Sequence, residues 1–165
     1  MPVVSNTSPL WNMASIERLD LLREQCPDIR IPQEVWQELQ VGHDYPELPR
    51  LQQAIDDRWI TVESLKNPHL RQSLMLELDA GEAAAIALAL ELDVDQILLD
   101  ETDGRTAAKV MGLHPIGILG VLLRAKLEGK LVSLSEEMSR LRHEAGFFIA
   151  DSLFQFLQDE AGERP

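Results

Sequence analysis

Short apolar runs rich in valine and isoleucine alternate along the chain with longer segments in which apolar residues recur every three or four positions. The short runs have the length of buried strands, and the longer segments have the period of amphipathic helices. Strands that alternate with helices in this way favour βαβ units around a parallel sheet. The pattern therefore predicts an α/β protein with strands at residues 3–5, 29–31, 59–62, 96–99 and 114–118.

Helical periodicity fills most of the chain between these strands. Pro9 is interpreted as a turn, and residues 41–49, with one glycine and two prolines, as a surface loop. Pro115 cannot donate to a neighbouring strand, so the last strand is placed at an edge of the sheet. No repeat or long linker divides the chain, and we expect a single domain over residues 1–165. The predicted helices are residues 16–25, 32–39, 79–92, 102–111, 119–128, 135–144 and 152–159.

Length and composition narrow the class of protein. A chain of 165 residues with 45% hydrophobic residues is long enough to bury a core. No apolar stretch approaches the roughly 20 residues that cross a bilayer, and the N-terminus lacks the features of a signal peptide. A lone cysteine, Cys26, fits a reducing compartment. We therefore expect a cytoplasmic protein without a membrane span.

The charge is strongly negative but unevenly distributed. The net charge is −13, whereas residues 104–132 hold five basic side chains and one acid and so carry +4. Two interpretations stay open: ordinary solvated helix faces, or a rim that contacts phosphates beside an acidic centre. The basic residues of this segment that could contact RNA are Arg105, Lys109, Arg124 and Lys126.

Polar residues follow two of the predicted strands where each one ends. Asn6 follows the first strand and Asp100 follows the strand at 96–99. In a parallel sheet these ends meet at one edge, and neighbouring strands lie about 4.8 Å apart, so both residues could share a cation. Glu101 and Asp103 add negative charge, although acids also favour a helix N-terminus. For Asp100, which directly follows a buried strand, the position favours a functional role.

Other acids have structural explanations that compete with a functional one. Asp79 and Glu82 have the spacing of a capping box at the start of a helix, and residues 133–136 resemble a second one. Glu38 lies four residues after Glu34, and exposed glutamates on helices often only solubilise. Thr7 could hold a water or a phosphate, or simply cap a turn. From local pattern alone, both kinds of role stay open for these residues.

Several well-known chemistries do not fit the sequence. No nucleophile elbow, Walker A loop or dinucleotide-binding fingerprint is present. A phospho-receiver domain would need an acidic pair after the first strand and a lysine after the last, where this chain has Asn6-Thr7 and Gly117-Ile118. The four histidines lack metal-ligand spacing, which argues against zinc; they are His43, His69, His114 and His143.

Taken in order, five segments resemble PIN-like domains of small prokaryotic proteins related to VapC-type toxin ribonucleases. Residues 4–10 read VSNTSPL, where the family's opening usually reads SDTSPL. Residues 31–39 (IPQEVWQEL) and 81–89 (GEAAAIALA) are similar to the second and third motifs. Residues 98–101 (LLDE) with 105–108 (RTAA) resemble the fourth, and residues 117–126 with 145–147 resemble the C-terminal region. The resemblance covers nearly the whole chain.

The resemblance implies a three-layer α/β/α sandwich with a short, mainly parallel central sheet. It further implies a metal-dependent ribonuclease that uses Mg²⁺ or Mn²⁺ to hydrolyse RNA, with RNA and a small antitoxin protein as partners and a homodimer as an assembly to test. The implied catalytic residues are Glu38, Glu82 and Asp100, and the implied metal ligands are Asn6, Glu38, Glu82, Asp100 and Asp103.

The departure from the family pattern is Asn6, which replaces the usual aspartate. An amide oxygen can coordinate a hard cation but brings no negative charge, so it weakens a metal site. An alternative function is therefore a catalytically weakened PIN-like module that binds RNA or a protein partner without efficient cleavage.

Overall fold

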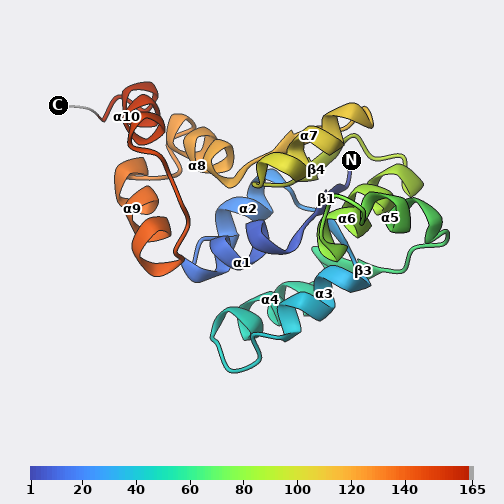
Figure 1. Cartoon of the computed structure of the whole chain (residues 1–165). Coiled ribbons are helices and arrows are strands. Elements are labelled where there is room, and N and C mark those ends of the chain that lie inside the picture. The colour runs from blue at the N-terminus through green and yellow to red at the C-terminus, as the bar shows by residue number, and fades with distance from the viewer. Residues whose placement is uncertain (164–165) are drawn as a thin grey trace.

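The computed structural model describes residues 1–163, and in this range five parallel strands form one sheet in the order β3-β2-β1-β4-β5 (Figure 1). The prediction of a parallel sheet is confirmed, and Pro115 lies on an edge strand as expected. The chain leaves the centre of the sheet in one direction for β2 and β3, then returns to the other side of β1 for β4 and β5. The strands are β1 (Val3–Ser5), β2 (Ile29–Pro32), β3 (Ile60–Glu63), β4 (Gln96–Leu98) and β5 (His114–Ile116).

Helices cover both faces of this sheet and make the predicted three-layer sandwich. In the described part of the chain they are α1 (Thr7–Ser15), α2 (Leu19–Gln25), α3 (Gln33–Gln40), α4 (Glu47–Asp56), α5 (His69–Leu74), α6 (Ala80–Glu91), α7 (Thr102–Val110), α8 (Ile118–Leu127), α9 (Leu134–Glu144) and α10 (Asp151–Glu160).

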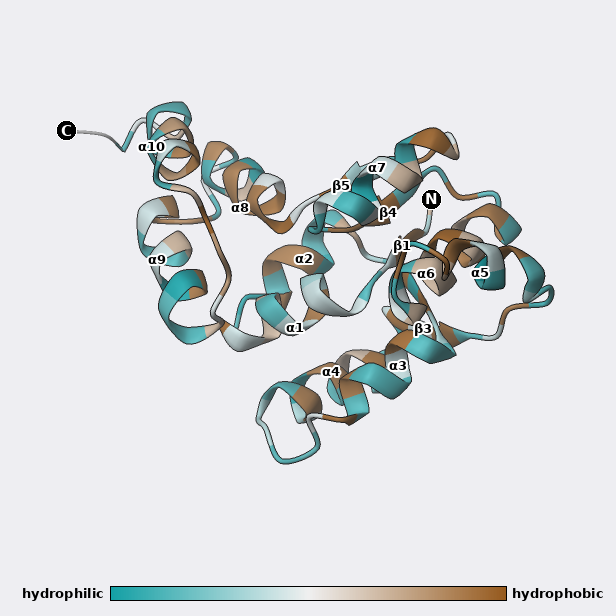
Figure 2. Ribbon diagram, viewed as in Figure 1, coloured by the Kyte–Doolittle hydropathy of each residue, from teal (hydrophilic) through white to brown (hydrophobic). Residues whose placement is uncertain are grey.

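Two apolar cores, one on each face, follow from the alternation of side chains along the strands. Val4 and Ile97 point to one face and pack with α6 and α7. Val3 and Leu98 point to the other face, where α1, α2, α8 and α9 lie. α6 is buried on all sides from Gly81 to Ala89, and Figure 2 shows it as mostly hydrophobic. Its small side chains allow it to lie close to the sheet.

The sequence pattern did not predict α1 or α4, and each of these helices contains a proline. α1 begins at Thr7 and contains Pro9 in its first turn; α4 begins at Glu47 and contains Pro49 in its first turn. The first N–H groups of a helix have no partner within it, so proline is tolerated there. The turn at Pro9 and the second half of the predicted loop at 41–49 are therefore wrong. The helix predicted at 16–25 begins only at Leu19.

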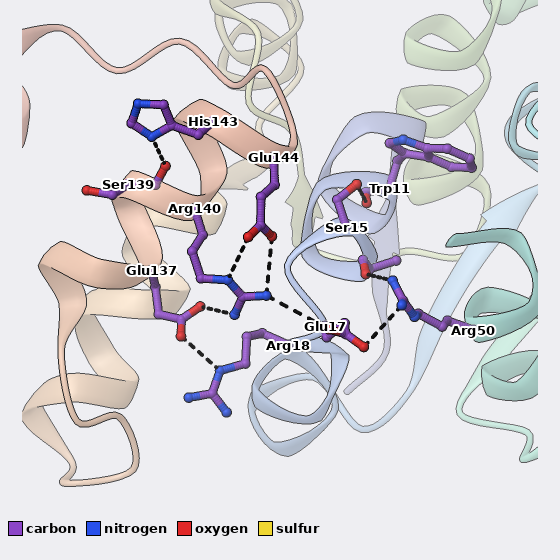
Figure 3. A network of polar contacts seen from close by, with 11 residues as sticks. Trp11, Ser15, Glu17, Arg18, Arg50, Glu137, Ser139, Arg140, His143 and Glu144 are labelled. Carbon is purple, nitrogen blue, oxygen red and sulfur yellow. Dashed lines mark hydrogen bonds and ion pairs between the residues drawn. The ribbon is translucent and has the colours of Figure 1, made fainter. Parts of the chain in front are cut away.

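A network of charged side chains joins α9 to the corner between α1 and α2 (Figure 3). Glu137 on α9 is 7% exposed and pairs with Arg18 at 3.4 Å and with Arg140 at 3.3 Å. Glu17, in the left-handed conformation with φ of 56°, pairs with Arg50 of α4 at 3.0 Å and lies 4.0 Å from Arg140. The pairs made by α9 reach residues more than 110 positions earlier in the chain.

Glu163 closes the C-terminal helices onto one another. Its carboxylate accepts hydrogen bonds from the backbone N–H groups of Leu134 at 2.6 Å and Ser135 at 2.8 Å, and it pairs with Lys126 of α8 at 3.3 Å. Burial alone would raise the pKa of Glu163, but the N–H groups of Ser135 and Leu134 outweigh it and lower the pKa to about 2. Ser133 accepts from the N–H of Glu136, which is one half of the predicted second capping box.

We predict that Glu163→Gln lowers the free energy of unfolding by about 1–2 kcal/mol at pH 7, because a charged acceptor at a helix N-terminus becomes neutral. The folded pKa lies below the ordinary value of 4.5, so this stabilisation is complete above about pH 4.5 and is lost as the pH falls towards 2. Urea unfolding at pH 7 and pH 3 measures both effects. Glu160→Gln, an exposed acid on α10, is the control; an equal loss in the two variants would contradict the capping role.

Candidate functional site

The candidate site lies at the carboxyl edge of the sheet, where β1 and β4 end side by side. Ser5 is paired with Leu98 across these strands, so Asn6 and Asp100 follow neighbouring strand ends. The strand order reverses between β1 and β4, and in open parallel sheets ligands bind in the crevice at such a reversal. The structure thus places Asn6 and Asp100 at the edge that the sequence pattern indicated.

Glu82 caps the start of α6 and has a second carboxylate oxygen that takes no part in the cap. Asp79 accepts a hydrogen bond from the N–H of Glu82 at 2.8 Å, and Glu82 Oε1 accepts from the N–H of Asp79 at 3.4 Å, so the predicted capping box is confirmed. The second oxygen, Oε2, is buried without a hydrogen-bond partner among the described residues. It lies 2.5 Å from the position that a Cβ on Gly104 would take, so α7 can approach Glu82 only because residue 104 is glycine.

Glu38 reaches the site from α3 and is held by two other elements. Thr7, at the start of α1, donates its hydroxyl to Glu38 Oε2 at 2.8 Å. The other carboxylate oxygen, Oε1, lies against Gly81 at the start of α6, where a Cβ would collide with it. The same Cβ would lie 3.1 Å from Asn6 Oδ1, so Glu38 and Asn6 approach α6 at one point. Thr7 therefore positions an acid, a role that its sequence context did not reveal.

Three oxygens at this edge are enclosed without a hydrogen-bond donor among residues 1–163: Asn6 Oδ1, Glu82 Oε2 and Asp100 Oδ2. Asn6 and Glu82 are each only 4% exposed. Buried acceptors without partners cost free energy, and a cation is the partner that suits three acceptors with no donor. The residues present therefore fit a hard divalent cation, which prefers oxygen ligands.

A second observation points to the same chemistry. Asp79, Glu82 and Glu101 each offer an oxygen, and these three oxygens all lie within 4.8 Å of one another. Ligands on opposite sides of one Mg²⁺ lie about 4.2 Å apart, so small side-chain rotations would bring these carboxylates onto one ion. The sequence analysis assigned Asp79 only to the cap and Glu101 only to the surroundings. Spacing could not show that the start of α6 and the start of α7 meet.

Burial raises the pKa values of the acids in the site. Burial is the largest cause for Glu82, whose pKa rises to about 7 with further contributions from Asp79 and Glu101. The pKa of Asp100 rises to about 6 because burial outweighs the N–H of Ile118, which donates to Oδ1 at 3.0 Å. Burial also raises the pKa of Glu38, against the hydrogen bond from Thr7. With a pKa of about 7, Glu82 without a cation is partly protonated near neutral pH, and Asp100 becomes protonated as the pH falls below about 6.

The structure places Asp103 apart from the clustered acids. It lies in the first turn of α7, exposed, lines a cavity together with Thr106 and Val110, and is not one of the three acids whose oxygens lie within 4.8 Å of one another. Its expected role as a metal ligand is untested, and this placement does not favour it.

The predicted RNA-contacting residues mostly have partners within the protein. Arg105 donates to the carbonyl of Leu99 at 2.8 Å, and its positive charge lowers the pKa of Asp100. Arg124 pairs with Glu128 at 3.1 Å, and Lys126 pairs with Glu163. Lys109 is exposed and makes no ion pair or hydrogen bond with any described residue. Contacts within the protein thus occupy three of these four side chains, and contact with RNA stays a prediction.

We predict that Asp100→Asn stabilises the metal-free protein at alkaline pH and not at acid pH. The folded pKa is raised, so the folded state keeps a proton between pH 3.8 and about 6 that the unfolded chain releases, and the free energy of unfolding falls as the pH rises through this window. Removing the charge should recover on the order of 2 kcal/mol at pH 8.

Urea unfolding with chelator at pH 8 and pH 3 tests this prediction. Asp95→Asn is the matched control, because Asp95 immediately precedes the other end of β4 and is exposed. A benefit of Asp100→Asn that is the same at both pH values would show that the Asp100 carboxylate is not strained by its charge.

Comparison with known proteins agrees with this geometry. A family model described as a PIN domain matches residues 2–163. A search of curated proteins and a search of solved structures each found no match. Among the helices of residues 1–163, none is long and apolar enough to cross a membrane. Since the family model matches nearly the whole chain, the protein belongs to the PIN-domain family.

Proposed function

We propose that this chain is a divalent-metal-dependent ribonuclease whose single PIN-like domain comprises residues 1–165. The observation that carries the proposal is the set of three enclosed, unpartnered oxygens of Asn6, Glu82 and Asp100 at the carboxyl edge of the sheet. PIN domains are generally nucleases, and an acidic group with metal-ligand spacing lies at the same edge. RNA as the substrate, and Mg²⁺ or Mn²⁺ as the ion, are parts of the proposal.

The residues that would hold the ion are the clustered carboxylates of Asp79, Glu82 and Glu101, together with Asp100 and the amide oxygen of Asn6. When bound, the ion supplies Lewis acidity that polarises a phosphoryl oxygen and lowers the pKa of water. In its absence these carboxylates would repel both one another and the phosphates of RNA. Binding of substrate therefore depends on their neutralisation.

The remaining groups position acids and handle protons. Thr7 holds one oxygen of Glu38 at 2.8 Å and leaves the other at the mouth of the site beside Gly81. Glu38 is exposed enough to exchange protons with water and has a raised pKa, so it can accept a proton from an attacking water. Lys109 is the predicted RNA contact that is free to meet a phosphate, and Arg105, Arg124 and Lys126 would first have to leave internal partners.

Asn6 favours a second candidate function. It is neutral and its oxygen is enclosed beside Glu38, where the family pattern usually has an aspartate. With one charge fewer, the site would bind a cation less tightly, and the protein could bind RNA or a protein partner without efficient cleavage. A small antitoxin and a homodimer also stay predictions that rest on the resemblance to VapC-type toxins.

We predict that Mn²⁺ raises the melting temperature of the protein. An ion at 100 times its dissociation constant stabilises the fold by about 2.7 kcal/mol, which for a chain of this size corresponds to about 5–10 °C. Thermal unfolding with millimolar Mn²⁺ and with chelator measures the shift. We expect the shift to disappear in Asp100→Asn and to persist in Asp95→Asn. Equal shifts in the two variants would show that the ion does not bind at this edge of the sheet.

We predict that Asn6→Asp increases the rate of Mn²⁺-dependent RNA cleavage by about tenfold, which corresponds to about 1.4 kcal/mol. The substitution is nearly isosteric and adds a charged ligand where a cation is expected. It should also lower the melting temperature in chelator, because it adds repulsion against Glu38 and Asp100.

The two measurements separate the candidate functions. If the parent protein cleaves RNA and Asn6→Asp cleaves it faster, the ribonuclease function is supported. If only the Asn6→Asp variant cleaves RNA, the weakened module is supported. Unchanged rates together with an unchanged metal-free melting temperature would mean that Asn6 does not face the acids.

A further inference from the structure

A cavity of about 510 Å³ lies along α7, and its lining includes chain neighbours of the acidic cluster. One wall is a stripe of α7 at helical spacing, formed by Asp103, Thr106, Ala107 and Val110. The opposite wall comes from the end of α5 and the turn that follows it, with Leu74, Glu77 and Leu78. Met111 completes the lining.

The acidic end of this cavity adjoins the cluster through the chain itself. Leu78 immediately precedes Asp79, and Asp103 follows Glu101 by two residues. Since Asp79 and Glu101 belong to the clustered acids, residues one and two positions away from the cluster line the cavity, and we infer that a nucleotide bound at the cluster can reach it. A group attached to the phosphate of that nucleotide is therefore presented to the cavity at high effective concentration.

The walls combine apolar surface with acceptors that have no partner. Leu74, Leu78 and Met111 supply apolar surface, and Val110 is 80% exposed although it is a large hydrophobic residue. Figure 2 shows hydrophobic colour at the C-terminal end of α7. The carboxylates of Glu77 and Asp103 make no ion pair or hydrogen bond with any described residue.

This lining selects the chemistry of an occupant. Among the described residues that line the cavity, none is basic, so it does not suit a phosphate. A flat apolar group with hydrogen-bond donors on its edge fits better, because carboxylates only accept. The exocyclic amines of cytosine, adenine and guanine are such donors, and carboxylates accept from the N4 amine of cytosine in other complexes. Uracil has no exocyclic amine, and its one edge donor, N3–H, lies between two carbonyl oxygens that the carboxylates repel.

We propose that this cavity is a base-selecting subsite that receives the nucleobase next to the scissile phosphate and prefers bases with an exocyclic amine over uracil. The aliphatic walls pack against the faces of the base, and Glu77 and Asp103 accept from its amine edge. Asp103 thereby acts in substrate selection instead of metal binding. The inference rests on the proposed ribonuclease function, because the cluster must hold the phosphate of the same strand.

Cleavage of matched oligonucleotides tests the preference. The substrates are oligouridine strands that contain one cytidine, adenosine or guanosine, and an all-uridine strand, each with Mn²⁺. We expect cleavage beside the amine-bearing base to be about tenfold faster than cleavage of all-uridine. The double variant Glu77→Gln with Asp103→Asn should reduce this ratio to near one. The control, Asp95→Asn with Glu160→Gln, removes the same charge from exposed positions elsewhere and should keep the ratio.

A binding measurement without metal tests the cavity independently of activity. Met111 lines the cavity, whereas Met13 and Met138 are buried in the opposite core, so their ¹³C-methyl NMR signals provide a reporter and two internal controls. Titration with cytidine, adenosine or guanosine should shift the Met111 signal, and uridine should shift it less. The same titration of the double variant should show no difference among the nucleosides.

The outcomes separate this inference from the proposed function. Cleavage with an unchanged base ratio in the double variant, or an unshifted Met111 signal, would overturn the subsite and leave the ribonuclease standing. If the double variant loses the same fraction of its rate on all strands and also loses the Mn²⁺ stabilisation, Asp103 would be a metal ligand instead of a base-selecting residue. A basic amphipathic peptide that shifts Met111 when no nucleoside does would make the cavity a protein-docking groove. No cleavage of any strand, with Met111 still shifted by the three nucleosides, would overturn the ribonuclease and support the pocket.

Discussion

Three acceptor oxygens that reach neither water nor a donor of the protein set the conditions for the rest of the site. An enclosed, unpartnered acceptor costs free energy, and a charged one costs more. The oxygens of Asn6, Glu82 and Asp100 stay in place because the two apolar cores hold the strands and α6 on which they lie. Packing that is favourable by itself thus maintains an arrangement that is unfavourable until a cation binds.

Two acids outside the site, in contrast, have several partners within the protein, as Figure 3 shows for Glu137. Glu137 has two arginine partners, and Glu163 has two backbone N–H groups and a lysine. Basic side chains form ion pairs with the acids that join distant helices, whereas the clustered acids Asp79 and Glu101 form no ion pair with any described residue. The paired acids Glu137 and Glu163 stabilise the fold, whereas the clustered acids fit the proposed binding of a cation.

The sequence predicted the sheet, its parallel strands and the edge at which Asn6 and Asp100 meet, because strand ends and burial are local properties of the pattern. Glu38 could be found only through the resemblance, since an exposed glutamate on a helix has no local signal. Asp79 was missed because its capping role, which is real, explained its presence fully. The pattern around Pro9 predicts a turn where α1 has already begun, because the sequence does not say how far a proline lies from a helix start. The sequence also could not show which positive charges of residues 104–132 form ion pairs, because some partners lie far away in the chain, such as Glu24 for Lys130.

The burial of α6 has a consequence for the motions of the protein. Its backbone amides from Gly81 to Ala89 are covered on every side, so hydrogen exchange there requires opening of both the helix and its packing against β1, β2 and β4. α10, in contrast, has mostly exposed side chains and can open locally. We therefore expect slow local opening around Glu82, so that this buried acid of the site keeps its position more firmly than the exposed acids of the molecule.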